Sequence, residues 1–485
     1  MAKMAFIGNT RSRPIHSYRQ IPRQSLNSET RNRSRLPRVA FQLSGLIMNT
    51  NDDVALPARQ MESLKVENLL INFTTEFHRI WDTKGSKAKP GAFWRPTPAP
   101  DALPGFFPLG DLAVSGHDNI NGKRVMAVVC EGDPQSEGTT KGKALSRPND
   151  YEQVWKDSGS GSRTDGSIWR PIPPDGYVAL GLVSSNNHEK PSLNAVRCVR
   201  ADLVIASSVG DVIWDDRGSG AKQNFSAWST DPPAAAAGEI YFAPGTFVGA
   251  ASFSKPATHV AAYSLRMQIP LQANPPSEVP VLTGFSAPPH ESSEATQVAT
   301  IPWFAVEDDA LEPIEKLTRS PLYQLERTDK YVLVGYGHNT GTKGKFFRWT
   351  AHRVLNPTLL RIFTDNTSIQ FRTEWPIATS GRVLPIKFSA RLSKSFTRTE
   401  TSSSGWMTSK SVEVVAIVPK NKILAVYQLQ SHYELLRKDG TQVAVNIAYT
   451  DSDSFYLAEY PPEVDSETTA TLPVADISAA INTAP

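Results

Sequence analysis

Six of the ten tryptophans in this chain of 485 residues form three pairs of similar spacing. The first tryptophan of each pair follows Ile or Val and is followed, four residues later, by Gly-Ser; the second comes 13 or 14 residues after the first. Because tryptophan is rare, this spacing indicates an internal repeat that occurs three times. The pairs are Trp81 with Trp94, Trp155 with Trp169, and Trp214 with Trp228.

Each copy of the repeat contains short stretches of β-branched and aromatic residues, interrupted by Gly, Asp, Ser and Pro. This pattern predicts about four short strands per copy, enough for one small sheet. Such a sheet cannot bury its apolar face alone, whereas three copies around a pseudo-threefold axis can. The sequence therefore predicts an all-β fold, with a pseudo-threefold β-prism of three repeats and an elongated antiparallel β-rich C-terminal domain. A three-bladed, propeller-like arrangement is the alternative for the repeats.

The turn after the first tryptophan of each copy carries an aspartate ahead of its Gly-Ser step. Asp82, Asp157 and Asp216 are the predicted ligand-binding residues of these turns, as partners for sugar hydroxyls or a cation. Trp94 and Trp169 are predicted to stack on a sugar beside them. The alternative is purely structural, because aspartates cap turn amides and tryptophans fill cores.

Four longer motifs accompany the tryptophans, at residues 93–100, 105–111, 168–181 and 190–199. Together they resemble the vacuolar protein sorting-associated protein 62 family over residues 76–270. The resemblance implies the fold of that family and a connection to vacuolar sorting, without a defined biochemical activity. The third copy departs from the pattern, because Ser-Thr follows its second tryptophan where the first two copies have Arg-Pro. We therefore expect a site shared by the first two copies to be missing from the third.

Charge and proline content divide the chain into five predicted parts. Residues 1–50 carry nine basic residues and one acid, a charge of +8, so the net charge of +3 leaves about −5 for the remainder. The leader is expected to be disordered, with a transit peptide or an arm for acidic lipid or nucleic acid as alternatives. Because the remainder is slightly acidic, no nucleic-acid partner is expected. The parts are a basic leader (1–60), the three-repeat module (61–270), a Pro-rich linker (271–302), a β-rich domain (303–462) and a flexible tail (463–485).

A strand of strict period two stands out in the C-terminal half. Phe388, Ala390 and Leu392 alternate with polar residues, and the following stretch 393–411 is rich in Ser and Thr. This strand, the Ser/Thr stretch and the apolar residues after it are predicted to form a hairpin that resembles the insertion region of aerolysin-like β-pore-forming proteins. Small hydroxyl residues suit such a hairpin because they tolerate both water and a pore lumen. The resemblance implies that Phe388, Ala390, Leu392 and Phe396 insert into a membrane. A long solvated hairpin is the alternative.

The sequence lacks the common catalytic and metal-binding signatures. It contains no Gly-rich phosphate loop, no dinucleotide fingerprint, no His-Glu-x-x-His, no Cys-x-x-Cys and no Gly-x-Ser-x-Gly. Its nine histidines have no metal-ligand spacing. Cys130 and Cys198 occupy similar places in successive repeats, which predicts two separate thiols rather than a disulfide. We therefore expect no enzymatic activity, no metal and no cofactor.

Three functions follow as hypotheses. The first is a membrane- or glycan-binding protein, a pore-forming toxin or defence protein, whose prism recognises lipid head groups or glycans and whose hairpin inserts after the chain oligomerises on the membrane. The second is a non-enzymatic adaptor for vacuolar or endosomal protein sorting, and the third is a polysaccharide hydrolase. No run of 18 uncharged apolar residues and no secretory signal pattern is found. The expected location is the cytoplasm or a membrane periphery, with secretion without a standard signal peptide as the alternative.

Overall fold

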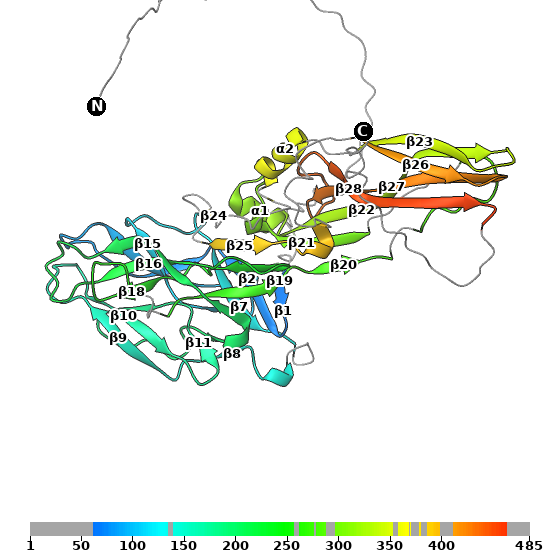
Figure 1. Cartoon of the computed structure of the whole chain (residues 1–485). Coiled ribbons are helices and arrows are strands. Elements are labelled where there is room, and N and C mark those ends of the chain that lie inside the picture. The colour runs from blue at the N-terminus through cyan, green and yellow to red at the C-terminus, as the bar shows by residue number, and fades with distance from the viewer. Residues whose placement is uncertain are drawn as a thin grey trace, which may run out of the picture. The chain divides into compact units, whose positions relative to one another are not determined.

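Strands predominate in the computed structural model of the chain, and helices are few and short (Figure 1). The predicted all-β fold is therefore confirmed. The predicted leader (1–60), the tail (463–485) and residues 398–410 of the Ser/Thr stretch lie outside the described residues. The described residues are 62–133, 139–256, 261–275, 278–287, 296–352, 357–367, 369, 378–379, 386–397 and 411–462.

The N-terminal half consists of three successive groups of six strands that share one pairing order. In each group the first, sixth and fourth strands form one sheet, and the second, third and fifth strands form another. This shared order fits the predicted prism. The first group is β2 (Leu69–Thr74), β3 (Phe77–Asp82), β4 (Gly91–Pro96), β5 (Phe107–Pro108), β6 (Leu112–Ser115) and β7 (Met126–Glu131), with β1 (Leu64–Val66) added beside β2. The second group is β8 (Leu145–Ser146), β9 (Asp150–Lys156), β10 (Gly166–Ile172), β11 (Tyr177–Val178), β12 (Val183–Asn186) and β13 (Cys198–Arg200). The third group is β14 (Val204–Ala206), β15 (Ser208–Asp215), β16 (Ser226–Asp231), β17 (Glu239–Phe242), β18 (Val248–Ala250) and β19 (Tyr263–Gln268).

The first tryptophans of the three pairs meet in one buried apolar cluster. The ring centroid of Trp81 lies 5.5 Å from that of Trp155 and 6.3 Å from that of Trp214. Each indole Nε1 donates a hydrogen bond to a backbone carbonyl of the next group. Because the bond from the third group returns to the first, the three bonds close a ring. The acceptors for Trp81, Trp155 and Trp214 are the carbonyls of Thr164 (2.8 Å), Gln223 (2.9 Å) and Lys89 (2.8 Å).

Two glycines make room for these indoles. A Cβ atom added at Gly91 or at Gly166 would lie 2.5 Å from an indole atom of a neighbouring group, which is too close for any side chain. Both glycines stand three residues before the second tryptophan of their group, and Phe225 holds that place in the third group. The ring centroid of Phe225 lies 5.5 Å from that of Trp155. The core therefore contains a phenyl ring at one of three related places and bare backbone at the other two.

The second tryptophans differ in how their indole nitrogens are satisfied. Trp169 donates from Nε1 to Ser167 Oγ (2.8 Å), and Trp228 donates to Ser226 Oγ (2.7 Å). The first group has Ala92 at the place of these serines. The buried Nε1 of Trp94 has no hydrogen-bond partner among the described residues. A buried donor without an acceptor lowers stability, because the group has lost its water without a replacement.

This difference predicts that Ala92→Ser stabilises the protein. The added hydroxyl would accept from Trp94 Nε1 as serine does in the other two groups, and we expect the free energy of unfolding to rise by about 1 kcal/mol. Urea unfolding followed by tryptophan fluorescence measures the change. The reverse variant, Ser167→Ala, should lower the free energy of unfolding by about 1–2 kcal/mol. Equal stability of all three proteins would contradict the assignment.

The C-terminal half contains a five-stranded antiparallel sheet and a separate two-stranded ribbon. The predicted antiparallel β-rich character of this half is therefore confirmed. The sheet has the order β20 (Leu271–Ala273), β21 (Gln297–Pro302), β22 (Leu322–Asn339), β27 (Lys422–Leu436) and β28 (Ile447–Tyr460). The ribbon pairs β23 (Lys345–His352) with β26 (Ser411–Val418). The helices are α1 (Pro313–Arg319), α2 (Pro357–Thr367) and α3 (Lys394–Thr397), and single 3-10 turns occur at Thr139–Lys141, Ala201–Leu203 and Trp303–Ala305.

One strand from the C-terminal half joins a sheet of the N-terminal half. Strand β25 (Lys387–Arg391) pairs with β17 on one side and with β24 (Ala378–Thr379) on the other. Strand β26 pairs with β23 instead, so the expected pairing between the two arms of the hairpin is wrong. The physical reason lies in β17, where Phe242 and Ile240 stand opposite Phe388 and Ala390 and share their apolar core.

The two cysteines lie in different sheets. Cys130 is in β7 and Cys198 begins β13, and both are free thiols. The prediction of two separate thiols is therefore confirmed. Burial raises the pKa of the Cys198 thiol to about 12, so this group stays protonated and unreactive at neutral pH.

Candidate functional site

The three turns that carry the predicted aspartates contact one another. The backbone N–H of Arg163 in the second turn donates to the Lys84 carbonyl in the first (2.8 Å). The backbone N–H of Lys222 in the third turn donates to the Ser158 carbonyl in the second (3.1 Å). The structure thus gathers the three predicted turns in one place.

Two of the aspartates use their carboxylates inside their own turns. Asp157 is fully buried and accepts hydrogen bonds from the hydroxyls of Ser160 and Ser162, both at 2.6 Å. Asp216 is also buried and accepts from the backbone N–H of Phe225 (2.8 Å). Burial raises the pKa of the Asp216 carboxyl, since the charged form loses water that hydrogen bonds from two backbone amides and the Ser219 side chain only partly replace. These two groups hold the turns in shape.

The other three predicted residues, Asp82, Trp94 and Trp169, make separate contacts. Asp82 is half-buried and pairs with Arg79, at 3.4 Å. Trp94 and Trp169 are 4% and 7% exposed and belong to two separate apolar clusters. A ligand that reaches the carboxylates of the buried aspartates or these two indoles would have to displace packed side chains. Ligand binding by the five residues stays a prediction.

The raised pKa of Asp216 predicts a pH effect on stability. A carboxyl whose pKa is higher in the folded than in the unfolded state favours folding when protonated, and this contribution is lost as the pH rises through the folded-state pKa. Asp216→Asn keeps an acceptor for Phe225 and cannot ionise. We therefore expect the variant to gain stability relative to the natural protein between pH 4 and pH 7. Urea unfolding at both pH values measures this, and Asp82→Asn is the matched control, which should show a smaller change. A constant difference across the range would contradict the prediction.

The exposed apolar surface of the C-terminal ribbon is the second candidate site. On its outer face Phe346 is 66% exposed, Ile417 is 57% exposed and Val415 is 47% exposed. Phe346 and Ile417 are direct cross-strand partners, so their side chains form one patch. Large apolar groups that face water in this way mark an interaction surface when they are contiguous.

The inner face of the ribbon is fixed to the long sheet by two aromatic rings. Phe347 and Trp349 stack nearly parallel, with ring centroids 5.9 Å apart. They lie over glycines of β22, because a Cβ atom at Gly335 would come within 2.1 Å of Trp349 and one at Gly337 within 2.6 Å of Phe347. The sheet thus leaves space for both rings, which pack the ribbon against β22.

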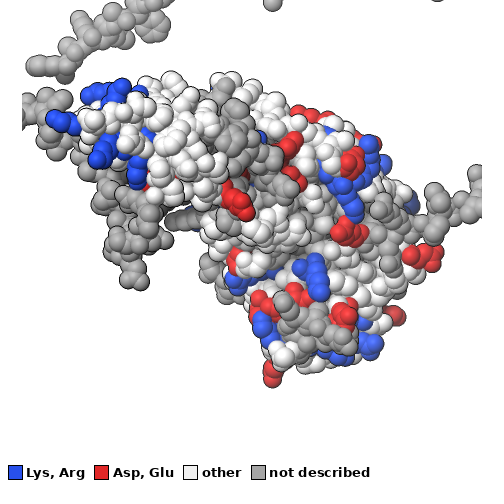
Figure 2. Space-filling model, turned by 90° about the vertical axis from the view of Figure 1, so that its right-hand side faces the viewer, with Lys and Arg blue, Asp and Glu red and all other residues white. Residues whose placement is uncertain are grey.

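Basic residues surround the end of the ribbon that carries Phe346 and Ile417. Lys343, Lys345 and Lys420 are exposed there, and no acidic residue occurs in the sequence from 340 to 347 or from 414 to 422. Figure 2 views the molecule from the right-hand side of Figure 1 and shows Lys and Arg side chains gathered at one margin of a face with few acidic residues around them. The patch therefore combines apolar side chains with positive charge.

Sequence reasoning missed this surface because its two strands are far apart in the chain. The pairing of Phe346 with Ile417 joins segments separated by about 70 residues, and no local pattern encodes it. The exposed Val415 and Ile417 form a period-two signal within β26, but such alternation does not tell which face meets water.

The described ranges contain neither a membrane-spanning helix nor a cluster of metal-binding side chains. Among those residues, no helix combines the length and the apolar character needed to cross a membrane. The same ranges hold no group of three or more His, Cys, Asp or Glu side chains placed to bind a metal ion.

Comparison with known proteins finds a family match for the N-terminal half. Residues 41–278 match the model of the family described as vacuolar protein sorting-associated protein 62, so the resemblance carried by the tryptophan motifs is confirmed. No curated protein matches the chain in sequence.

Two solved structures are similar to parts of the chain. GNIP1Aa from Chromobacterium piscinae is 23% identical over 41% of this chain and 37% of its own, with a TM-score of 0.33. The chain thus spans well under half of that protein. Cry35Ab1 is 11% identical over 82% of this chain and 91% of its own, with a TM-score of 0.31.

Proposed function

We propose that this protein is a non-enzymatic membrane-binding protein and that the β23–β26 ribbon is the surface that meets the lipid. The observation that carries the proposal is the exposed patch of Phe346, Val415 and Ile417 beside exposed lysines. Aromatic and branched apolar side chains enter the boundary between head groups and acyl chains, and lysines attract anionic head groups. A ribbon with both features suits binding at the bilayer interface.

The insertion hypothesis concerns a different segment, which is buried in the folded protein. Phe388, Ala390, Leu392 and Phe396 are between 0% and 6% exposed. Their entry into a membrane therefore requires β25 to separate from β17. Pore formation is a second step that this proposal adds to surface binding.

Polar contacts hold this segment at both ends. Lys387 pairs with Asp231 at 2.6 Å and with Asp211 at 3.0 Å. At the other end, the Phe396 carbonyl accepts from Arg327 (3.0 Å) and from the Tyr433 hydroxyl (3.0 Å). Insertion would break all of these bonds, so it needs a trigger such as membrane contact or assembly into a homo-oligomer.

The family match supports a second candidate function, an adaptor in vacuolar or endosomal protein sorting. Such an adaptor also binds a membrane, and it differs from a pore-forming protein in leaving the bilayer intact. Recognition of a glycan by the gathered aspartate turns is compatible with either function. Membrane binding is common to both, and permeabilisation separates them.

We expect the protein to float with liposomes that contain anionic lipid. The double variant Phe346→Gln with Ile417→Gln removes two exposed apolar groups without touching the core, and it should lower the partition coefficient about tenfold or more. Liposome flotation measures the partition.

Val212→Gln is the matched control, because Val212 is 50% exposed on β15 of the other half. It should float like the natural protein. Undiminished flotation of the double variant would rule out the ribbon as the lipid-binding surface.

A disulfide between β17 and β25 tests the insertion step. Ile240 and Ala390 are cross-strand partners, so Ile240→Cys with Ala390→Cys should join the two strands when oxidised. We expect the oxidised protein to bind dye-loaded liposomes without releasing dye, and reduction to restore release. Ala390→Cys alone is the control for oxidation. Dye release by the oxidised double variant would contradict insertion of this segment, and a lack of release by every form would favour the adaptor.

A further inference from the structure

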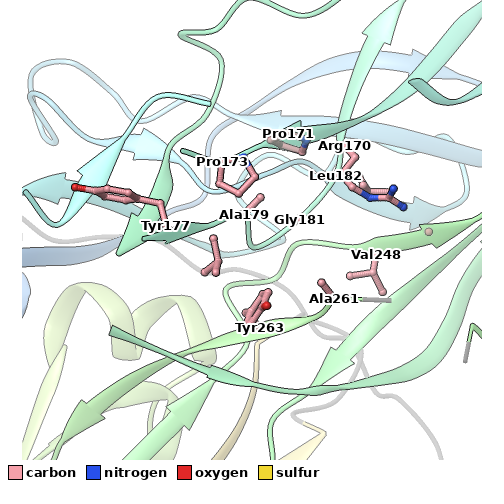
Figure 3. Close-up of a pocket in the computed structure, with 12 residues that line it drawn as sticks. Arg170, Pro171, Pro173, Tyr177, Ala179, Gly181, Leu182, Val248, Ala261 and Tyr263 are labelled. Atoms are coloured by element: carbon pink, nitrogen blue, oxygen red, sulfur yellow. The ribbon is translucent and has the colours of Figure 1, made fainter. Parts of the chain in front are cut away.

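A cavity of about 270 Å³ lies between the second and third strand groups. Its walls include Pro173 and Leu182 of the second group and Val248 and Tyr263 of the third, with Arg170 at its edge. Figure 3 shows these side chains around a shared hollow. This volume is just below the range of about 300–1,000 Å³ for sites of drug-sized ligands, so it suits a smaller molecule.

The equivalent place between the first and second groups is closed by an ion pair. Arg95, which follows Trp94 on β4, makes a bidentate pair with the buried carboxylate of Asp111 (2.9 and 3.0 Å). That carboxylate also accepts from the backbone N–H of Ser184 in the second group (2.7 Å). A guanidinium, a carboxylate and a serine thus fill this junction.

Strand pairing shows which residues replace this set at the second junction. Arg170 follows Trp169 as Arg95 follows Trp94. The backbone N–H of Asp111 donates to the Leu182 carbonyl (2.9 Å), and the backbone N–H of Leu182 donates in the same way to the Phe247 carbonyl (3.0 Å). Leu182 therefore stands in the second group where Asp111 stands in the first. The second junction therefore keeps its arginine and has lost the buried carboxylate.

The same junction has also lost its serine and an aromatic ring. Ser184 and Gly249 each follow the cross-strand partner of the second tryptophan of their group, so Gly249 replaces Ser184 at this junction. A Cβ atom at Gly249 would lie 2.9 Å from Leu182. Val178 replaces Phe107, because both stand opposite a buried valine of their sheet. These smaller side chains leave the cavity open.

The side chain of Arg170 has only a weak partner. Its guanidinium reaches Glu152 at 2.7 Å, and the two side chains are 47% and 59% exposed. An ion pair so open to water contributes little free energy, so the carboxylate of a ligand can take the place of Glu152 on Arg170 at little cost.

We propose that this cavity binds a small apolar carboxylic acid, whose carboxylate pairs with Arg170 as Asp111 pairs with Arg95. The apolar part of the acid packs against Pro173, Leu182, Val248 and Tyr263. The ligand supplies a carboxylate, which the related junction has in Asp111 and this junction lacks. A sugar fits less well, because walls of proline, valine and leucine offer few partners for its hydroxyls. This site is separate from the proposed lipid-binding surface, which lies on β23 and β26 of the C-terminal half.

The test uses the full-length protein and 4-fluorophenylacetate as the probe. Fluorine NMR of the probe measures its dissociation constant, and 2-(4-fluorophenyl)ethanol is the neutral comparison of similar size. We expect the acid to bind at least about tenfold more tightly than the alcohol, since a hydrogen bond to a charged group is roughly twice as strong as a neutral one.

Two variants assign the binding to this cavity. Arg170→Gln should weaken binding of the acid about tenfold and leave the alcohol unaffected. Ala261→Leu places a larger side chain on an exposed part of the wall and should weaken both probes. Lys190→Gln is the matched control, because it removes a cation of similar exposure that pairs with Asp150, and neither residue lines the cavity. Unfolding temperatures confirm that each variant is folded. Equal affinity for acid and alcohol, unchanged affinity in both cavity variants, or no binding of the acid at millimolar concentration would each overturn the proposal.

Discussion

The ring of three indole hydrogen bonds is the contact on which the N-terminal half depends. Each bond joins two strand groups, and each donor comes from a residue that also fills the shared core. Apolar packing alone has no direction, whereas these bonds fix how far each group is turned relative to the next. The two glycines that face the indoles follow from the same contact, since a Cβ atom at either place would push a ring away from its acceptor.

The three junctions around this ring are built from related positions but filled differently. The first is closed by a buried ion pair, while the second keeps the arginine and opens into a cavity. In the third group Ser229 stands where the others have arginine, and Phe247 stands where they have Asp111 and Leu182. The shared backbone order stays constant because the strands fix it, and the side chains at the junctions are free to diverge. The junctions therefore differ most in charge and open volume where the repeat is least regular.

Much of this architecture was readable from the sequence, and the limits have physical causes. The tryptophan pairs predicted the repeat, and the short β-branched and aromatic stretches between turn residues predicted the strands, because both patterns are local in the sequence. Which strands pair was not readable: the alternation of Phe388 and Ala390 predicted a strand, but its partner β17 lies about 150 residues earlier. The aspartate turns were placed in contact by the fold, yet two of their carboxylates point inward, and only side-chain contacts reveal that. The cavity could not be predicted either, because only the backbone hydrogen bonds show that Leu182 stands where the first group has Asp111.

The long-range pairing of β25 with β17 has a consequence for how the chain is made. The third strand group is complete in sequence once Gln268 has been synthesised, yet one edge of its sheet has no partner until residue 391 has followed. An open edge with apolar Ile240 and Phe242 is a template for wrong pairing with other chains. The edge stays open for the time that the ribosome needs to add more than a hundred residues. Binding of a chaperone would cover the edge during this time. Faster translation of the second half would shorten the exposure and raise the yield of native protein.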